Sequence, residues 1–551
     1  MIGRLVLSDR NIFKIKLGTK QVSARKCFIL SESINGDVLV KTSKEFNPRD
    51  EYIKLDPKTN TILEGYGLVG DIKSDLGIYY HMFTLGWMSE SKYSKLWDEY
   101  LFDEHNKLID RDLINLNNSS RLERVLYTDQ VITIDPPNSI DLDDGFSFRS
   151  DPNFYWLDIH IADPVSWFDL SNPICKNIFR EIYTRQQSCY IGAPNLDWKS
   201  NKPTHLLPPK VVQIISLLEL ELDLNDNQTE QEKQEKQELK QNQVRTRRAI
   251  SFCFKISKQT KSIEHFELKF TSLTNIKNYS YEQYDGKINN PEEIALKSEL
   301  VNLSNDLIGI IGLNKGFVPV TTHSDISHKM IEIFMILTNW YGGNHLIDCI
   351  GWEKTVLRTQ MASDVHDDEF DILTIPIWAR PILSKSANYK FGEDTNIHYS
   401  LGISNYSHMS SPMRRFVDML NHFGLYRIDP SVFVNFNPYD LEQINKTVKG
   451  QKKISNGYDL IKFIKTNEFG ANTNKFKACL FDYTELPDKS SKKSMLVLYQ
   501  EEYKFIRVVN VEMPQTELTA RLSKYMEFDV ELYYNSNNFK SQKFPFSIKL
   551  L

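Results

Sequence analysis

The sequence is poor in cysteine and has no long apolar run. Its six cysteines are scattered over 551 residues and none forms a C-x-x-C pair, which disfavours zinc ribbons, zinc knuckles and thioredoxin-type redox sites. No apolar stretch approaches the roughly 20 residues that a membrane-spanning helix needs. The opening residues, MIGRLVLSDRNIF, resemble neither a secretory signal nor an arginine-rich transit peptide. We therefore expect a reducing, cytoplasmic location and no membrane association.

The chain also lacks an excess of positive charge. It has 67 lysines and arginines against 72 aspartates and glutamates, a formal net charge of −5. This balance argues against a protein that coats nucleic acid with its whole surface, but it is compatible with an enzyme that has a local positive channel. What is present is a composition ordinary for globular proteins, with 41% apolar and 25% charged residues.

Short apolar runs separated by turn residues occupy both ends of the chain. Residues 1–72 and 472–551 each show this pattern of a small antiparallel barrel, and the second has the spacing of a five-stranded OB-type barrel. Residues 73–120 predict a mainly helical connector, and strands and helices alternate over 121–465, which predicts an α+β domain. Within it, the polar low-complexity insertion at 225–243 cannot build a core.

Two local patterns inside the α+β region are specific enough to test. Apolar and polar residues alternate over 154–163, which predicts a strand whose polar face carries His160; a buried, hydrogen-bonded histidine is favoured there over a catalytic one. Ser411 and Pro412 predict the start of a helix, because serine is a preferred N-cap and proline a preferred first helical residue.

The most informative stretch is TIDPPNSIDLDDGF at 133–146. It holds four carboxylates within ten positions: Asp135, Asp141, Asp143 and Asp144. Carboxylates brought to one point repel one another unless a cation neutralises them. Hard oxygen ligands suit Mg²⁺ or Mn²⁺, and four of them could hold two ions roughly 4 Å apart, an arrangement that promotes in-line phosphoryl displacement.

Other interpretations of this acidic run must be weighed. An EF-hand loop needs glycine at its sixth position and glutamate at its twelfth. Counted from Asp141, those positions hold Phe146 and Pro152, so an EF-hand is excluded. A solvated acidic turn, the usual fate of aspartate runs, and a structural capping network both stay open on the local sequence alone.

The run 133–144 resembles the signature T-I-D-P-x-x-x-x-D-x-D-D of the RNase II (RNB) family of exoribonucleases, with every acidic position matched. Further blocks are similar to family segments and keep the family order: WLDIHIADPVSWF at 156–168, SCYIGAPN at 188–195, HLLPPKV at 205–211, IEIFMILTN at 331–339 and YSHMSSPMRRFVDMLNH at 406–422. Together they extend the resemblance far beyond one acidic turn.

The resemblance implies an RNB-type mixed catalytic domain flanked by small OB-type β-barrels, the first of OB or cold-shock type. It implies hydrolysis of single-stranded RNA in the 3′→5′ direction, with release of nucleoside 5′-monophosphates. Mg²⁺, with Mn²⁺ as an alternative, would be the cofactor. No small organic cofactor is expected, and a monomer is the default.

The resemblance also implies roles for individual residues. The four aspartates named above would hold the metal ions, and Asp143, Asp144 and Arg414 would be catalytic. Arg414 would contact the scissile phosphate, a role that suits the guanidinium fork. Arg415 beside it, Tyr190 and Glu332 would contact RNA, with Tyr190 stacking on the 3′-terminal base and Glu332 near the ribose.

One segment departs from the family pattern and supports a second hypothesis. Residues 450–460, GQKKISNGYDL, lack the glutamate–arginine pattern expected late in the catalytic domain. Only one barrel is apparent at the N-terminal end, where many members carry two. A catalytically weak or silent RNA-binding relative that acts as a regulatory subunit is therefore the alternative to an exoribonuclease.

Overall fold

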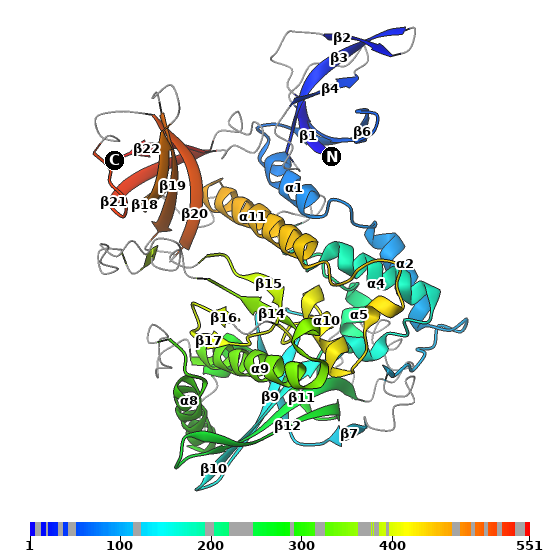
Figure 1. Ribbon diagram of the computed structural model, residues 1–551, viewed down its shortest axis with the longest axis vertical. Coiled ribbons are helices and arrows are strands. Elements are labelled where there is room, and N and C mark those ends of the chain that lie inside the picture. Colours follow the sequence, from blue (N-terminus) through cyan, green and yellow to red (C-terminus); the bar gives the residue numbers. More distant parts are fainter. Residues whose placement is uncertain are drawn as a thin grey trace, which may run out of the picture.

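A central mixed body with two small β units on one side makes up the molecule, as the computed structural model shows (Figure 1). The structure describes the chain except residues 6–12, 18–19, 31–36, 42–50, 114–122, 193–202, 220–245, 287–290, 315–325, 362–375, 377, 380–384, 393–395, 466–473, 486–490, 501–504, 515–520 and 535–545. The insertion expected at 225–243 therefore lies outside the described residues.

Within the described residues, seven strands form the curled sheet of the central body. In spatial order they are β13 (Ile276–Ser280), β8 (Val131–Asp135), β9 (Asp144–Ser150), β10 (Phe154–Ala162), β11 (Arg247–Ser257), β12 (Ser262–Leu273) and β7 (Arg124–Tyr127). The inner strands pair antiparallel, and the two edge pairs β13–β8 and β12–β7 are parallel. The strand expected over 154–163 is confirmed as β10.

Helices pack against this sheet and share its core. They are α4 (Pro173–Arg185), α5 (Pro209–Ile215), α7 (Tyr281–Gly286), α8 (Pro291–Ile311), α9 (Ile326–Ile350) and α10 (Phe416–Leu425), with short 3₁₀ turns at Pro164–Trp167, Trp352–Lys354 and Pro430–Val432. Two-stranded ribbons, β14 (Val356–Thr359) with β15 (Asn388–Phe391) and β16 (Ile397–His398) with β17 (Ile403–Ser404), lie beside α9. Every residue of α10 is buried, so this helix passes through the core.

The N-terminal part is a small curled sheet followed by helices. Its strands are β1 (Ile2–Leu5), β2 (Phe13–Leu17), β3 (Lys20–Ile29), β4 (Asp37–Lys41), β5 (Glu51–Leu55) and β6 (Ile62–Leu68). They lead into α1 (Ile72–Phe83) and α2 (Glu90–Leu101). Asp71 caps α1 by accepting the Ser74 amide at 3.0 Å, which explains why the helix begins there.

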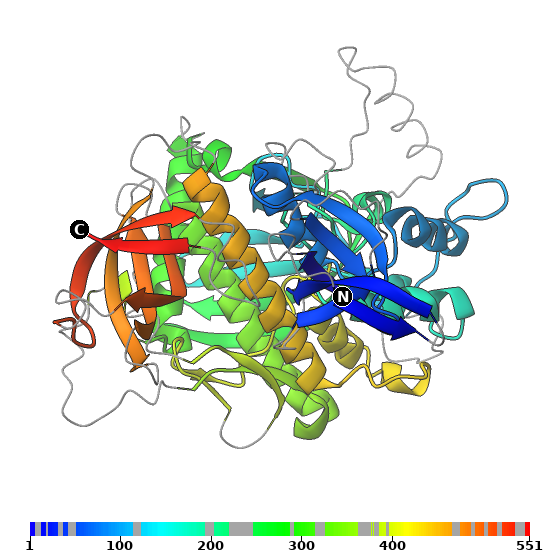
Figure 2. The ribbon, with the colours of Figure 1, turned by 90° about the horizontal axis from the view of Figure 1, so that it is seen from above.

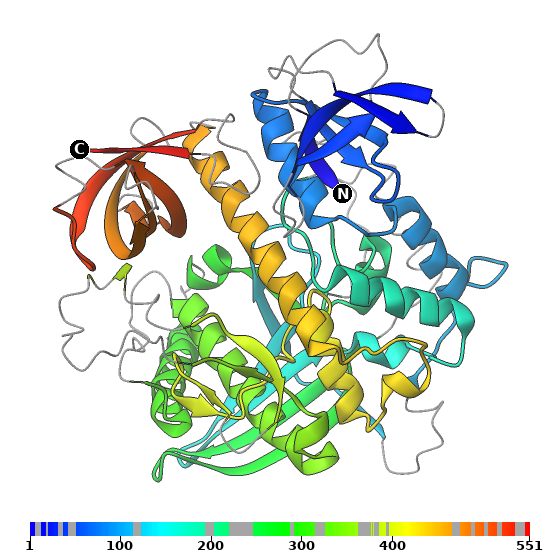
Figure 3. The ribbon, with the colours of Figure 1, turned by 45° about the horizontal axis from the view of Figure 1, so that its top comes forward.

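The C-terminal part is a five-stranded sheet in the order β20 (Phe505–Pro514), β19 (Ser491–Gln500), β18 (Lys475–Glu485), β21 (Glu527–Tyr534), β22 (Phe546–Leu550). The edge strands β20 and β22 approach each other, so the sheet curls into a partly open barrel (Figure 3). The long helix α11 (Leu441–Lys465) runs between this barrel and the N-terminal sheet (Figure 2).

Two hydrophobic cores result from this arrangement. The larger fills the central body. The second joins α1 and α11 to both small β units and includes Cys189 and Ile191 from the central body. Tyr190, which stands between Cys189 and Ile191 in the sequence, therefore lies where the two cores meet. Among the described helices, none is both long and apolar enough to cross a membrane.

Candidate functional site

The acidic run folds into a hairpin between β8 and β9. Asp135 ends β8 and Asp144 begins β9, with Asp141 and Asp143 in the loop that joins them. We call these four residues the acid cluster. A methyl group at Gly145 would lie 2.9 Å from Val131 Cγ1, so the missing side chain lets β9 lie close against β8.

Backbone hydrogen bonds hold this loop in place. The Asp143 carbonyl accepts the Ala162 amide at 2.7 Å. The Leu142 amide donates to Ser216 Oγ at 2.9 Å, and the Leu142 carbonyl accepts the Leu217 amide at 3.1 Å. A solvated turn would leave these groups to water. The local interpretation as a solvated acidic turn is therefore wrong for Asp143, whose side chain is only 3% exposed.

Arg414 reaches the acid cluster from a segment 271 residues further along the chain. Its Nε donates to Asp143 Oδ2 at 3.2 Å, and its Nη2 donates to Ser411 Oγ at 2.8 Å. The neighbouring Met413 amide donates to the other Asp143 oxygen at 2.8 Å. Because 42% of the Arg414 side chain stays exposed, the guanidinium can also meet an anion from solvent.

The helix that carries this segment begins later than the sequence predicts. Ser411 is not its N-cap, since α10 starts at Phe416. The Ser411 amide donates to Asp418 Oδ1 at 2.8 Å, and Arg415 is extended and pairs with Gln187. Backbone groups of residues 411–415 thus bond to carboxylates and to the segment before Tyr190. Because these groups are engaged there, the segment does not form a helix.

Tyr190 lies beside the acid cluster as well. Its hydroxyl donates to Asp141 Oδ2 at 2.9 Å, while 51% of the residue is exposed. Its neighbours Cys189 and Ile191 are buried in the second core, so alternation along the chain turns Tyr190 outward. One face of the ring is thereby placed next to the carboxylates, where it can contact a ligand.

Two of the residues expected to bind RNA are engaged elsewhere. Arg415 Nη2 pairs with Asp418 Oδ1 at 2.8 Å and is largely buried. Glu332 is exposed on α9 and pairs with Lys329 at 2.8 Å, and no contact among the described residues joins it to the acid cluster. The predicted RNA contacts of Arg415 and Glu332 remain predictions.

The four carboxylates differ in their electrostatics. Burial, and then repulsion by the other three aspartates, raises the pKa of Asp135 to about 8. Burial raises the pKa of Asp144 to about 6, although Arg414 and Arg415 oppose this. Burial also raises the pKa of Asp143 well above its usual value, against the effect of Arg414. Asp135, Asp143 and Asp144 are therefore harder to ionise than an ordinary aspartate unless a further positive charge lies beside them.

Asp141 differs from the other three aspartates. Burial by itself would raise its pKa, but nearby His205 and the hydrogen bond from Tyr190 lower the pKa below its usual value. His205 Nδ1 lies 3.3 Å from Asp141 Oδ2. Asp141 is thus the member of the cluster that holds its negative charge most readily.

The acid cluster fits a divalent cation in its chemistry. Asp135 Oδ2 is buried and has no hydrogen-bond partner among the described residues, and a buried unpartnered carboxylate oxygen is costly unless a cation binds it. Yet among the described residues no three carboxylate, histidine or cysteine side chains lie close enough to share one ion. Among the described residues, Arg414 supplies the positive charge next to Asp143.

The sequence interpretation did not single out two residues next to the acid cluster. His205 lies within a block that resembles the family, but the histidine itself carried no distinctive signal. Tyr281 follows Ser280, which pairs with Asp135 between β13 and β8, and its ring stacks on His328 with centroids 3.6 Å apart. Burial, followed by the charges of Asp144 and Asp135, raises the pKa of Tyr281 to about 12.

The central domain matches a known protein family. A model of the RNB domain matches residues 124–373 and 379–428, more than half of the chain. The chain belongs to the RNB family. The resemblance drawn from the sequence motifs is confirmed, as is the α+β fold class that it implied.

The proteins similar to this chain include nucleases. Ribonuclease R of Mycoplasmopsis pulmonis is 24% identical over 383 residues, which cover 59% of this chain and 50% of that protein. The chain thus spans about half the length of this relative. RNase R of Mycoplasma genitalium has a similar fold, with a TM-score of 0.55 at 13% identity over 100% of this chain and 89% of that one. That enzyme has also been solved with single-stranded and with double-stranded RNA.

A relative without nuclease activity has the same fold. Yeast Ssd1, described as a pseudonuclease, matches with a TM-score of 0.55 and 13% identity over 98% of this chain and 69% of that one. RNB-family membership therefore establishes a fold associated with exoribonucleases, and activity has to be argued from the residues of the site.

Proposed function

We propose that the protein is a divalent-metal-dependent exoribonuclease that hydrolyses single-stranded RNA in the 3′→5′ direction and releases nucleoside 5′-monophosphates. The observation that carries the proposal is the meeting of Arg414 with Asp143 in the acid cluster. A guanidinium and several carboxylates in one pocket suit a phosphodiester, because the carboxylates can hold cations and the guanidinium can bind phosphate oxygens.

Each residue has a task in this proposal. Asp135, Asp141, Asp143 and Asp144 would hold Mg²⁺, or Mn²⁺ in its place. When bound, the metal would neutralise the carboxylates and withdraw electron density from the scissile phosphate. Arg414 would bind the phosphate with the exposed part of its guanidinium and stabilise the negative charge that grows during attack by water.

Tyr190 would hold the 3′-terminal base. Stacking on an aromatic ring does not depend on base identity and contributes about 1–3 kcal/mol per base. Its hydroxyl is fixed by Asp141, so the ring has a defined position relative to the phosphate site. A terminal base held there would place the last phosphodiester near Arg414 and the acids, which would explain removal of one nucleotide at a time.

The alternative is a silent RNA-binding relative. It is supported by the absence, among the described residues, of three potential ligands close enough to share an ion. Against it stands the raised pKa of Asp135, since a protein without a bound cation gains nothing from unpaired buried acids.

The test is a comparison of RNAs labelled at either end, incubated with Mg²⁺. The proposed enzyme releases the 3′-terminal label at once as a mononucleotide, whereas the 5′ label appears in a mononucleotide only at the end of digestion. We expect Asp143→Asn and Arg414→Ala to slow release by about 10²–10³-fold.

Asp129→Asn, an exposed aspartate in the same domain, is the matched control and should keep full activity. Retention of RNA without any release by the wild-type protein in Mg²⁺ or Mn²⁺ would favour the silent relative. Equal release by wild type and Asp143→Asn would reject the site.

A further inference from the structure

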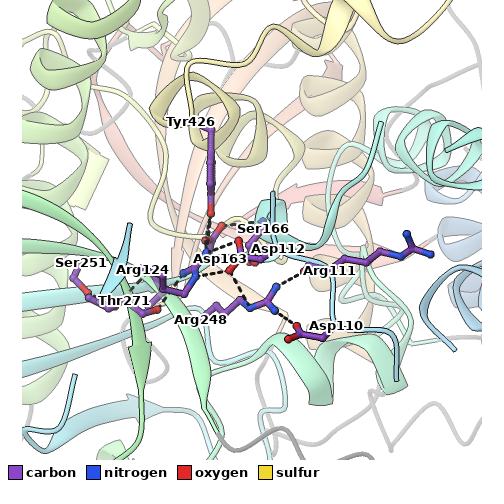
Figure 4. Close-up of polar contacts among 11 residues, drawn as sticks. Asp110, Arg111, Asp112, Arg124, Asp163, Ser166, Arg248, Ser251, Thr271 and Tyr426 are labelled. Atoms are coloured by element: carbon purple, nitrogen blue, oxygen red, sulfur yellow. Dashed lines mark hydrogen bonds and ion pairs between the residues drawn. The ribbon is translucent and has the colours of Figure 1, made fainter. Parts of the chain in front are cut away.

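A second charged cluster lies in the same domain (Figure 4). We call it the Asp163 cluster; its members are Asp112, Arg124, Asp163, Arg248 and Tyr426. One carboxylate oxygen of Asp163 accepts from Arg124 Nη2 at 3.1 Å and from the Tyr426 hydroxyl at 2.5 Å. The other accepts the Ser166 amide at 3.2 Å. Asp163 has no exposed surface, so its carboxylate depends on these protein groups and not on solvent for hydrogen bonds.

Arg124 links Asp163 to neighbouring elements. Its Nε donates to Asp112 at 2.8 Å, and its Nη1 donates to the Thr271 carbonyl on β12 at 3.1 Å. Arg248 on β11 lies 3.6 Å from the same Asp112 carboxylate. Two arginines thus face two nearly buried aspartates, and a guanidinium with several fixed partners has little freedom to move.

The Asp163 cluster is connected to the acid cluster at two points. Asp163 directly follows Ala162, whose amide holds the Asp143 carbonyl at 2.7 Å. Tyr426 directly follows α10, and the ten residues of that helix begin just after Arg414 and Arg415. The Tyr426–Asp163 hydrogen bond therefore holds one end of α10 next to the end of β10. From that end the helix extends about 15 Å back toward Arg414, which pairs with Asp143.

We propose that Tyr426 and Asp163 are positioning residues, whose hydroxyl–carboxylate hydrogen bond fixes α10 against the end of β10 and so holds Arg414 opposite Asp143. The inference rests on the proposed function, in which Arg414 and Asp143 act on the phosphate. Small displacements of such groups have large effects on rate, because the reacting atoms must be held in a narrow range of geometry.

The Tyr426 hydroxyl is suited to this task. Burial, followed by the neighbouring Asp163 carboxylate, keeps the pKa of Tyr426 well above its usual value, so the hydroxyl stays protonated and donates. Tyr426→Phe removes the hydroxyl, which donates to Asp163 and also accepts from Arg124 Nη2 at 3.0 Å, and keeps the ring, which packs against Phe270 with centroids 4.5 Å apart. Asp163 then still has Arg124 and the Ser166 amide, so the fold is retained.

The first experiment compares Tyr426→Phe with Tyr93→Phe in RNA hydrolysis. Tyr93 is equally buried in the same core and donates to the Leu206 carbonyl at 3.1 Å, without contact to α10 among the described residues. We expect Tyr426→Phe to lower kcat about tenfold with KM within about twofold, and Tyr93→Phe to change neither by more than about twofold. In an Arg414→Ala background Tyr426→Phe should cause no further loss, because the group it positions is absent.

The second experiment does not depend on activity. Hydrogen exchange is followed at the Met413 and Ala162 amides, which both donate to Asp143. Tyr426→Phe should accelerate exchange there about tenfold, and Tyr93→Phe should not. Unchanged exchange in Tyr426→Phe overturns the positioning role, even in an active enzyme. Accelerated exchange in Tyr426→Phe, together with a wild-type protein that fails to hydrolyse RNA, would instead support the positioning role and reject the proposed function.

Discussion

The acid cluster and the Asp163 cluster are built from the same residue types on the same sheet, yet their charges are balanced differently. In the Asp163 cluster, Arg124 and Arg248 face Asp112 and Asp163, and every one of these side chains is at most 11% exposed. In the acid cluster, Arg414 pairs with Asp143 and is 42% exposed, and one Asp135 oxygen has no hydrogen-bond partner in the part of the chain that the structure describes.

This difference separates a structural cluster from a candidate functional one. A buried charge pair contributes to the fold only when its members satisfy each other. The Asp163 cluster meets that condition. The acid cluster does not, since burial raises the pKa of Asp135, Asp143 and Asp144, and repulsion by other aspartates adds to the shift for Asp135 and Asp143. An unbalanced cluster stores repulsion that a cation from solvent can relieve, so the two clusters should respond oppositely to mutation and to metal.

The largest expected effect is the loss of stability in the balanced cluster. Asp163→Asn leaves Arg124 without one of its two buried carboxylates, and we expect the free energy of unfolding to fall by about 3–5 kcal/mol. Asp110→Asn is the control, because the Asp110 side chain is 83% exposed and pairs with Arg248 at the surface, so the change should stay below about 1 kcal/mol. Denaturant unfolding followed by circular dichroism measures both. Equal stability of Asp163→Asn and Asp110→Asn would contradict the structural role assigned to the Asp163 cluster.

The next effect is stabilisation by metal in the unbalanced cluster. Mg²⁺ at a hundredfold excess over its dissociation constant should raise the free energy of unfolding of the wild-type protein by about 2.7 kcal/mol. Asp135→Asn should abolish most of this gain, whereas Tyr93→Phe, a buried change outside both clusters, should preserve it. Thermal unfolding with a Mg²⁺ titration makes the comparison. A wild-type protein indifferent to Mg²⁺ and Mn²⁺ would contradict the assignment of the acid cluster as a metal site.

A smaller effect of opposite sign is expected without metal. In EDTA, Asp135→Asn should raise the free energy of unfolding by about 1 kcal/mol, because it removes a carboxyl group whose ionisation is opposed by burial and then by repulsion from the other three aspartates. The same substitution should abolish RNA hydrolysis. Destabilisation comparable to that of Asp163→Asn would show that Asp135 supports the fold, and the contrast between the clusters would fail.

The sequence was sufficient for the acid cluster because its four members lie within one short run. The strand over 154–163 could likewise be predicted from local periodicity. Arg414 was placed by resemblance only, and the start of α10 was misplaced because the Ser411 and Met413 amides serve carboxylates instead of a helix.

The Asp163 cluster could not be predicted in the same way. Its residues come from five separate segments between Asp112 and Tyr426, and each looks locally like an ordinary surface charge or aromatic residue. Their partnership depends on how β7, β10, β11 and α10 meet, which spacing along the chain does not encode. For the same reason Tyr281 and His205 were missed beside the acid cluster.

The smallest expected effect on stability concerns His160, a residue of β10 close in sequence to Asp163 of the balanced cluster. The expectation of a buried, hydrogen-bonded histidine is confirmed, since its Nδ1 lies 2.7 Å from Ser251 Oγ, which bonds Thr271 Oγ1 in turn. Burial lowers the pKa of His160 to about 3 from the ordinary 6.5. The unfolded chain therefore binds this proton first as the pH falls, and stability is lost below pH 6.5.

The loss assigned to His160 should be about 1 kcal/mol between pH 6.5 and 5.5. His160→Gln should flatten the pH dependence of the free energy of unfolding by one proton, whereas His105→Gln, an exposed histidine, should leave the slope unchanged. Denaturant titrations at several pH values give the slope. An unchanged slope in His160→Gln would mean that His160 is charged in the folded protein, and the region around Asp163 would then hold an unbalanced positive charge of its own.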